Sequence, residues 1–282
     1  RNHVEETYKR PLFDRLIRNI LSLTLPKPNV FLFLALATKI IKPFSFIMPE
    51  FLRNSLKLMP NKIPSKKIKT KTVYLSESKK TVARVALLVG CVQRVISPEI
   101  NESTIRLLNR HDVEVVVLPK IDCCGSLNHH LGKKKLAHVS FVKNIELWHE
   151  EYLKNGLDAI ISNTSGCGTT LKDYGFIFRN DKELKKKAKK ISELTKDITE
   201  YLDEKLILKI KNNNEKKYKI AYHSACSMQH GQKIHEQPKN LIKQTGNTVL
   251  DVPEGHMCCG SAGTYNILHQ KMAKSLLKNK VE

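Results

Sequence analysis

The sequence predicts an α/β protein made of two similar βαβ units with parallel sheets, preceded by a basic helical segment. Three observations predict this class. Short apolar runs rich in β-branched residues alternate with stretches of helical period. One cysteine pattern occurs twice at the same spacing, and the start of the chain combines a helical period with basic side chains. Strands that alternate with helices are typical of parallel sheets, because parallel strands need a crossover connection.

The N-terminal segment is expected to be mostly helical over residues 1–59, with Pro26 and Pro28 interrupting the helix. Its most apolar stretch, residues 30–37, is too short to span a bilayer, because a span takes about 20 apolar residues. We expect this stretch to be buried against the protein's own core, with an amphipathic contact to a membrane surface as the alternative. Residues 60–72 contain prolines and lysines without an apolar period, which predicts a linker.

The rest of the chain contains the two βαβ units. In the first unit, strands are predicted at residues 82–89, 113–118 and 159–162, with helices over 98–110 and 131–152. The second unit is expected to have strands at 219–222 and 248–252, with helices over 233–244 and from near Asn266. A Lys/Glu-rich helical region over 181–208 bridges the units. The predicted division is therefore a helical segment and linker (1–72), a first domain (80–178), a helical connector (179–216) and a second domain (217–282).

The formal net charge is +22, with 27% charged and only 6% aromatic residues. Most of the positive charge is lysine, whereas base recognition and base stacking favour arginine and aromatic side chains. We therefore expect a solvated lysine-coated surface and no nucleic-acid partner. Docking to an acidic protein or to anionic lipid is a secondary alternative.

The cysteines carry the functional argument. Cys91 lies 135 residues before Cys226, and the Cys-Cys-Gly triplet that begins at Cys123 lies 135 residues before the one that begins at Cys258. Such a recurrence indicates an internal duplication. In the first unit, each thiol follows a predicted strand, and parallel strands end at one edge of the sheet, where ligands gather. The thiols expected to meet there are Cys91, Cys123, Cys124 and Cys167, and the corresponding thiols of the second unit are Cys226, Cys258 and Cys259.

Several kinds of site use cysteine. Disulfides are disfavoured, because the sequence shows no export signal and adjacent cysteines bridge poorly. Inert buried cysteines would not recur at one spacing, and a catalytic thiol would need a base such as His129, His223 or His256. Zinc accepts four thiolates but usually takes closely spaced pairs, and it stays open as a structural alternative. Iron–sulfur ligation fits best. Glycines would let backbone N–H groups approach a cluster: Gly125, Gly166, Gly168 and Gly260.

Five local sequences resemble those of the cysteine-rich CCG domains, a family that includes glycolate oxidase iron–sulfur subunits, lactate-utilisation proteins and a subunit of heterodisulfide reductase. They lie at residues 87–101, 123–132, 165–175, 223–230 and 258–266. The similarity covers residues 80–282 and is closest to the glycolate oxidase subunits. It implies two Rossmann-like CCG domains whose cysteines hold an iron–sulfur cluster of the [4Fe–4S] type.

The resemblance also implies a function. The chain would be the electron-transfer subunit of an oxidoreductase complex, without catalytic residues of its own for the substrate. Partner subunits containing FAD would oxidise glycolate to glyoxylate, and the electrons would pass towards a membrane acceptor. The implied location is the cytoplasm, with peripheral contact to the inner face of the cytoplasmic membrane as an option. A subunit for lactate, another 2-hydroxy acid or a heterodisulfide is the alternative.

Three departures from the family pattern are visible. The ferredoxin-like Cys-x2-Cys runs that usually precede these domains are not in the sequence, so we expect a fragment. Thr164 stands where the family pattern has the first cysteine of a closing Cys-x2-Cys pair. The counterpart of Cys167 in the second unit would fall at position 302, past Glu282.

Overall fold

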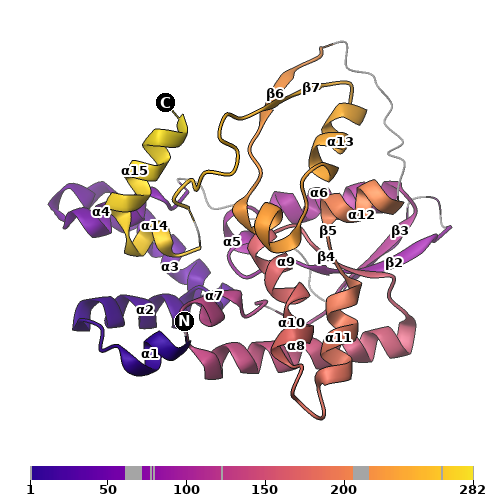
Figure 1. Cartoon of the computed structure of the whole chain (residues 1–282), viewed down its shortest axis with the longest axis horizontal. Helices are drawn as coiled ribbons and strands as arrows, with labels where there is room; N and C mark the ends of the chain where they lie inside the picture. Colours follow the sequence, from indigo (N-terminus) through magenta and orange to yellow (C-terminus); the bar gives the residue numbers. More distant parts are fainter. Residues whose placement is uncertain are drawn as a thin grey trace.

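The computed structural model describes residues 2–60, 72–76, 78, 80–121, 123–205, 216–261 and 263–281. The predicted linker lies almost entirely outside these residues. The N-terminal segment is helical, as predicted. It comprises α1 (Asn2–Thr7), α2 (Leu12–Thr24), α3 (Pro28–Ile41), the 3-10 helix η1 (Lys42–Ile47) and α4 (Glu50–Lys57). These helices gather at one end of the molecule, away from the main sheet (Figure 1).

Two expectations for the apolar N-terminal stretch are wrong. Helix α3 runs on into η1 through Lys39, Lys42 and Pro43, so that 20 residues, Pro28–Ile47, have the length and the mean hydropathy (1.8) of a membrane-crossing helix. The expected burial is also wrong for most side chains, because only 11% of the most apolar window is buried. Phe31 and Ala35 are the two buried residues of α3.

The main sheet has five strands in the order β1-β3-β2-β4-β5. Strands β2 (Ala83–Leu88), β3 (Val113–Val117), β4 (Ala159–Ser162) and β5 (Thr195–Asp197) are parallel, and β1 (Thr72–Tyr74) is an antiparallel edge strand. Three of these strands were predicted to within about one residue. The α/β class with a mostly parallel sheet is therefore confirmed.

Alternate residues of the central strand β2 pack on opposite faces of the sheet. Ala86 and Leu88 contact a cluster that includes Phe141 and Trp148 of α8 (Lys134–Asn155) and residues of α11 (Lys185–Leu194). On the other face, Val85 and Leu87 pack with α6 (Pro98–Arg110) and α12 (Ile198–Lys205). Helices cover both faces, which explains why β2 is an almost continuous apolar run.

The segment predicted as an all-helical connector contains β5. This strand pairs with β4, and Thr195 and Asp197 are buried in the pairing. Residues 195–197 therefore complete the first sheet. Lysine and aspartate are uncommon in strands, so the pairing of this short segment with β4 determines its conformation. The domain boundaries themselves stay predictions.

The second unit has a parallel pair, β6 (Lys219–Tyr222) and β7 (Thr248–Asp251), as predicted. A π-helix, η2 (Ser227–Gln232), precedes α13 (Gln237–Gln244), so the expected helix begins four residues late. Helices α14 (Tyr265–Leu268) and α15 (Gln270–Val281) follow. Helix α15 lies beside α4 (Figure 1), where Lys274 Nζ is 3.3 Å from Glu50 Oε1.

Candidate functional site

The candidate site lies at the carboxyl edge of the main sheet. Strands β3 and β4 flank β2 on opposite sides, so the chain leaves the centre of the sheet in two directions there. A crevice at such a switch point is where open α/β sheets bind ligands. Cys91 follows β2, Cys123 and Cys124 follow β3, and Cys167 follows β4.

The four thiols of the first unit meet in a chain of contacts, as the strand order predicts. Cys124 Sγ lies 3.1 Å from Cys167 Sγ. The Cys123 side chain is hydrogen-bonded to those of Cys124 and Cys91. Cys123 and Cys124 are buried, Cys91 and Cys167 are half-buried, and all four are free thiols. Three connections that are distant in sequence therefore bring four sulfur donors together.

Hydrogen bonds among these thiols shift their pKa values in opposite directions. Hydrogen bonds from Cys124 and Cys91 lower the pKa of the Cys123 thiol to about 3, and the charge of Arg94 favours the thiolate further. The same hydrogen bond to Cys123, together with burial, raises the pKa of Cys91. Hydrogen bonds to Cys123 and Cys167, with burial, raise the pKa of Cys124. Cys123 is therefore the thiol whose surroundings most favour the thiolate, the form in which cysteine binds metals.

The Cys-Cys-Gly turns of the two units have the same geometry. Gly125 has φ +81° and donates its N–H to Cys123 Sγ at 3.3 Å. Gly260 has φ +77° and donates to Cys258 Sγ at 3.4 Å. A β-carbon at Gly125 would lie 2.5 Å from Cε1 of Phe141. Both the backbone conformation and the close packing therefore require glycine there.

Two buried polar side chains hold the cysteine backbone. Asn144 Nδ2 donates to the carbonyl of Cys123 at 2.9 Å and to the hydroxyl of Tyr174 at 3.1 Å. The Tyr174 hydroxyl donates to the carbonyl of Cys124 at 2.7 Å. Tyr174 and Trp148 pack in the core, and Tyr174 also positions the site. Asn144 was not among the predicted site residues, although an asparagine on the core-facing side of a helix is a usable signal.

Arg94 and Thr164 connect the loops around the thiols. The Arg94 guanidinium donates to the carbonyls of Gly90, at 2.8 Å, and Ile121, at 3.1 Å, and so joins the connections after β2 and β3. Thr164 is the N-cap residue of α9 (Ser165–Lys172), and its hydroxyl donates to Gln93 Oε1. The position that carries a thiol in the family pattern is thus part of a polar network.

The predicted site glycines of α9 have different surroundings. A β-carbon at Gly166 would meet nothing within 4 Å, whereas one at Gly168 would lie 2.8 Å from Gln232 Nε2 of η2. Gly168 therefore allows close contact between α9 and η2. Cys167 also lies in the first turn of α9, a helix that was not among the predicted elements.

Contacts between α9 and η2 bring the two cysteine sets towards each other. Ser227 Oγ donates to Ser165 Oγ at 2.7 Å, and Gln232 Nε2 donates to the Ser165 carbonyl at 3.0 Å. Cys226 directly precedes η2, and burial raises the pKa of its thiol, with a smaller contribution from Cys258 and Cys259. Cys258 is exposed and Cys259 half-buried, so the second set is more open than the first.

The donor set consists of sulfur. Within the described ranges, no group of three or more His, Cys, Asp or Glu side chains has the geometry of a metal-ion site. The thiols lie in pairwise contact across three connections instead. All-thiolate donors suit iron–sulfur clusters and zinc. The N–H groups of Gly125 and Gly260, which point at sulfur, match the hydrogen bonding that tunes iron–sulfur clusters.

Fold and site together define an α/β protein with a thiolate site at the switch point of a parallel sheet. The sequence profile of the CCG cysteine-rich domain matches residues 85–172 and again residues 220–282. The chain belongs to this family, as the local motifs predicted.

Relatives with curated names agree with this assignment. The glycolate oxidase iron-sulfur subunit of Escherichia coli (strain K12) is 34% identical over 281 residues, which cover all of this chain and 65% of the relative. The probable glycolate oxidase iron-sulfur subunit of Bacillus subtilis (strain 168) is 28% identical over 83% of this chain and 52% of the relative. Lactate utilization protein A of Geobacillus sp. (strain WCH70) is 25% identical over 71% of this chain and 81% of the relative. The chain thus spans about half to two thirds of the length of the first two. The first two relatives are both named as iron–sulfur subunits of glycolate oxidase, the second as a probable one.

Proposed function

We propose that this chain is the iron–sulfur electron-transfer part of a glycolate oxidase type complex. It would receive electrons from a partner subunit that contains FAD and oxidises glycolate to glyoxylate, and pass them towards a membrane acceptor. The observation that carries the proposal is the meeting of four thiols from three connections at the carboxyl edge of the sheet. The names of the relatives support the choice of glycolate.

In this proposal, the thiols of the first unit hold a [4Fe–4S] cluster, and those of the second unit contribute three ligands to another site. A bound cluster supplies one-electron transfer. Asn144 and Tyr174 hold the carbonyls of the Cys-Cys pair, and Arg94 fixes the two neighbouring loops. Asn144 and Tyr174 are buried, and Arg94 is hydrogen-bonded to backbone carbonyls. The cysteine sulfur atoms would therefore move little when the charge of the site changes.

The contact between α9 and η2 supports a route between the two sites. Ser165 and Ser227 lie on the segments that carry Cys167 and Cys226, and their hydroxyl groups are hydrogen-bonded. A short, packed connection favours electron exchange between the sites over exchange with solvent. We place the complex in the cytoplasm, in peripheral contact with the inner face of the membrane.

The test is electron transfer from the flavoprotein. The cluster-loaded chain is mixed anaerobically with the flavoprotein subunit that has been reduced by glycolate, and flavin reoxidation is followed by absorbance. We expect flavin oxidation with simultaneous bleaching of the cluster band, and none of either with Cys123→Ser. Flavin that stays reduced beside the loaded chain would overturn the proposal. Faster transfer from a lactate-reduced flavoprotein would assign the chain to the lactate-utilisation relatives.

A further inference from the structure

Helix α3 and η1 present an exposed apolar stripe along one face. Phe33 and Ile40 are 71% and 74% exposed, and Ile47 is 72% exposed. Leu36 and Phe44 lie between them and are also exposed. The steps of three or four residues place all five on one side of a helix. Exposed large apolar side chains in such an array mark an interaction surface.

The opposite face of the same helix packs on the protein. Phe31 and Ala35 are buried and form a small core with Val95, which belongs to α5 (Gln93–Ile96). A helix that crosses a bilayer would expose all its sides to lipid or to other membrane helices. With the fold intact, the stripe can therefore lie in the surface of a membrane but cannot cross it, although its length and hydropathy would allow a span.

Charge identifies the kind of surface that would cover the stripe. Residues 15–49 contain five basic residues and no acidic residue, and of these only Arg18 is buried, where it pairs with Asp14 and Glu5. Lys27 and Lys39, at the start of α3 and within its last turn, are exposed. Basic side chains beside an apolar helix face favour an anionic lipid surface, since each lysine near such a surface contributes attraction.

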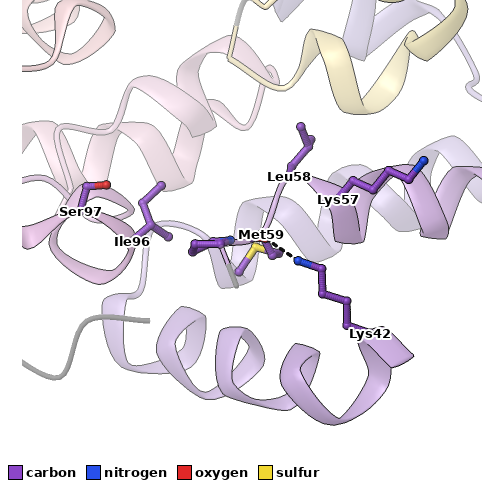
Figure 2. Close-up of a pocket in the computed structure, with 7 residues that line it drawn as sticks. Lys42, Lys57, Leu58, Met59, Ile96 and Ser97 are labelled. Carbon is purple, nitrogen blue, oxygen red and sulfur yellow. Dashed lines mark hydrogen bonds between the residues drawn. The ribbon is translucent and has the colours of Figure 1, made fainter. Parts of the chain in front are cut away.

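A pocket of about 350 Å³ opens beside the stripe, where η1, α4 and the end of α5 meet (Figure 2). Its lining includes Lys42, Lys57, Leu58, Met59, Ile96 and Ser97. Lys42 Nζ donates to the carbonyl of Met59 at 3.0 Å, which anchors one wall. Apolar and ammonium groups thus occur together at this end of the molecule.

Helix α2 lies at the same end of the molecule (Figure 1) and has a second stripe of exposed apolar residues. Leu12, Leu16, Ile20 and Leu23 follow the same spacing and are exposed. The inner side of α2 is tied to the first unit, because Ser22 Oγ donates to Asn128 Oδ1 at 2.7 Å. Both stripes belong to helices that are fixed to the folded unit by their other faces.

We propose that the stripe on α3 and η1 is a docking surface for an anionic lipid bilayer, in which the helix lies in the plane of the interface with Phe33, Ile40 and Ile47 inserted. This deepens the peripheral location contained in the proposed function. Its test measures lipid binding and not electron transfer, so either proposal can fail alone.

The test is co-sedimentation of the 282-residue chain with vesicles of phosphatidylcholine containing about 30% phosphatidylglycerol. We expect binding that weakens with salt and falls at least about tenfold on pure phosphatidylcholine. The triple variant Phe33→Ser, Ile40→Ser, Ile47→Ser should lower the partition coefficient at least about a hundredfold, because each large apolar side chain contributes about a tenfold factor.

The matched control is Val139→Ser, Leu153→Ser, Phe176→Ser, which removes apolar side chains that are 66%, 70% and 66% exposed on α8 and α10 (Tyr174–Ile177). This control should bind like the unaltered chain. Unaltered binding by the stripe variant, or equal loss by the control, would overturn the proposal. The proposal would also be overturned if the unaltered chain bound no vesicles and formed dimers that the stripe variant abolished. The stripe would then be the contact surface for a second copy of this chain. The double variant Lys27→Glu, Lys39→Glu leaves the apolar stripe intact. It should lose binding to anionic vesicles and keep the weak binding to pure phosphatidylcholine unchanged.

Discussion

Replacing Gly125 with alanine tests whether the Cys-Cys-Gly turn is fixed by steric packing. The added β-carbon would lie 2.5 Å from Cε1 of Phe141, and φ is +81°. The left-handed conformation costs alanine about 1–2 kcal/mol, and overpacking costs about 1–3 kcal/mol more. Phe141 cannot easily yield, because it is buried and its ring centroid lies 4.9 Å from that of Tyr174. We expect a loss of about 2–5 kcal/mol of unfolding free energy.

The assay is urea denaturation of the cluster-free protein, with Gly90→Ala as the matched control. Gly90 has φ +69°, but a β-carbon there would make only an ordinary contact of 3.6 Å with Gln93. The control should therefore lose about 1–2 kcal/mol, from backbone conformation alone. Adding Phe141→Leu to Gly125→Ala should cost less than Phe141→Leu costs in the unaltered chain. Equal losses for Gly125→Ala and Gly90→Ala would refute the steric argument.

Three further predictions concern the thiols and their supports. Cys123→Ser should abolish iron binding at the first site, whereas Cys226→Ser should leave that iron in place. Metal analysis combined with electron paramagnetic resonance measures the iron of each variant. Equal loss of iron in both variants would contradict the assignment of Cys123, and not Cys226, to the first site. In the cluster-free protein, maleimide should label the exposed Cys258 before the buried Cys123, as judged by peptide mass spectrometry, and equal rates would contradict the described burial. Tyr174→Phe removes the hydrogen bond to the Cys124 carbonyl and leaves it without that donor, so it should cost about 1–3 kcal/mol in urea denaturation; a change near zero would contradict that role.

Regular, strongly periodic segments were predictable from the sequence. Helix α6 and strand β6 begin and end at the predicted residues, because proline at the helix start and a clear apolar run define them. Strand β5 was not predictable, since three polar residues become a strand only by pairing with β4. Helix α9 was missed because Gly166 and Gly168 lower helix propensity locally, whereas its packing on η2 favours it.

The sequence predicts that the thiols converge, but it does not predict the contacts that support them. The spacing of the cysteines and the order of the strands were enough to predict that Cys91 and Cys167 lie at the same edge of the sheet. The supporting contacts of Asn144 and Arg94 depend on how α8 and two loops are positioned next to the Cys-Cys pair. This position cannot be predicted from the pattern of apolar and polar residues. The exposed stripe on α3 was misjudged for a related reason. Apolar composition predicts that a helix face will be covered, but it does not say whether by the protein's own core or by another surface.

The most direct test of the central claim is anaerobic reconstitution of the chain with iron and sulfide, followed by metal and acid-labile sulfide analysis. We predict a brown protein with broad absorbance at about 400 nm that dithionite bleaches, with iron and sulfide bound in equal amounts. Cys123→Ser should lose most of that absorbance. A colourless protein that binds zinc in stoichiometric amounts and takes up no sulfide would contradict the assignment of an iron–sulfur site.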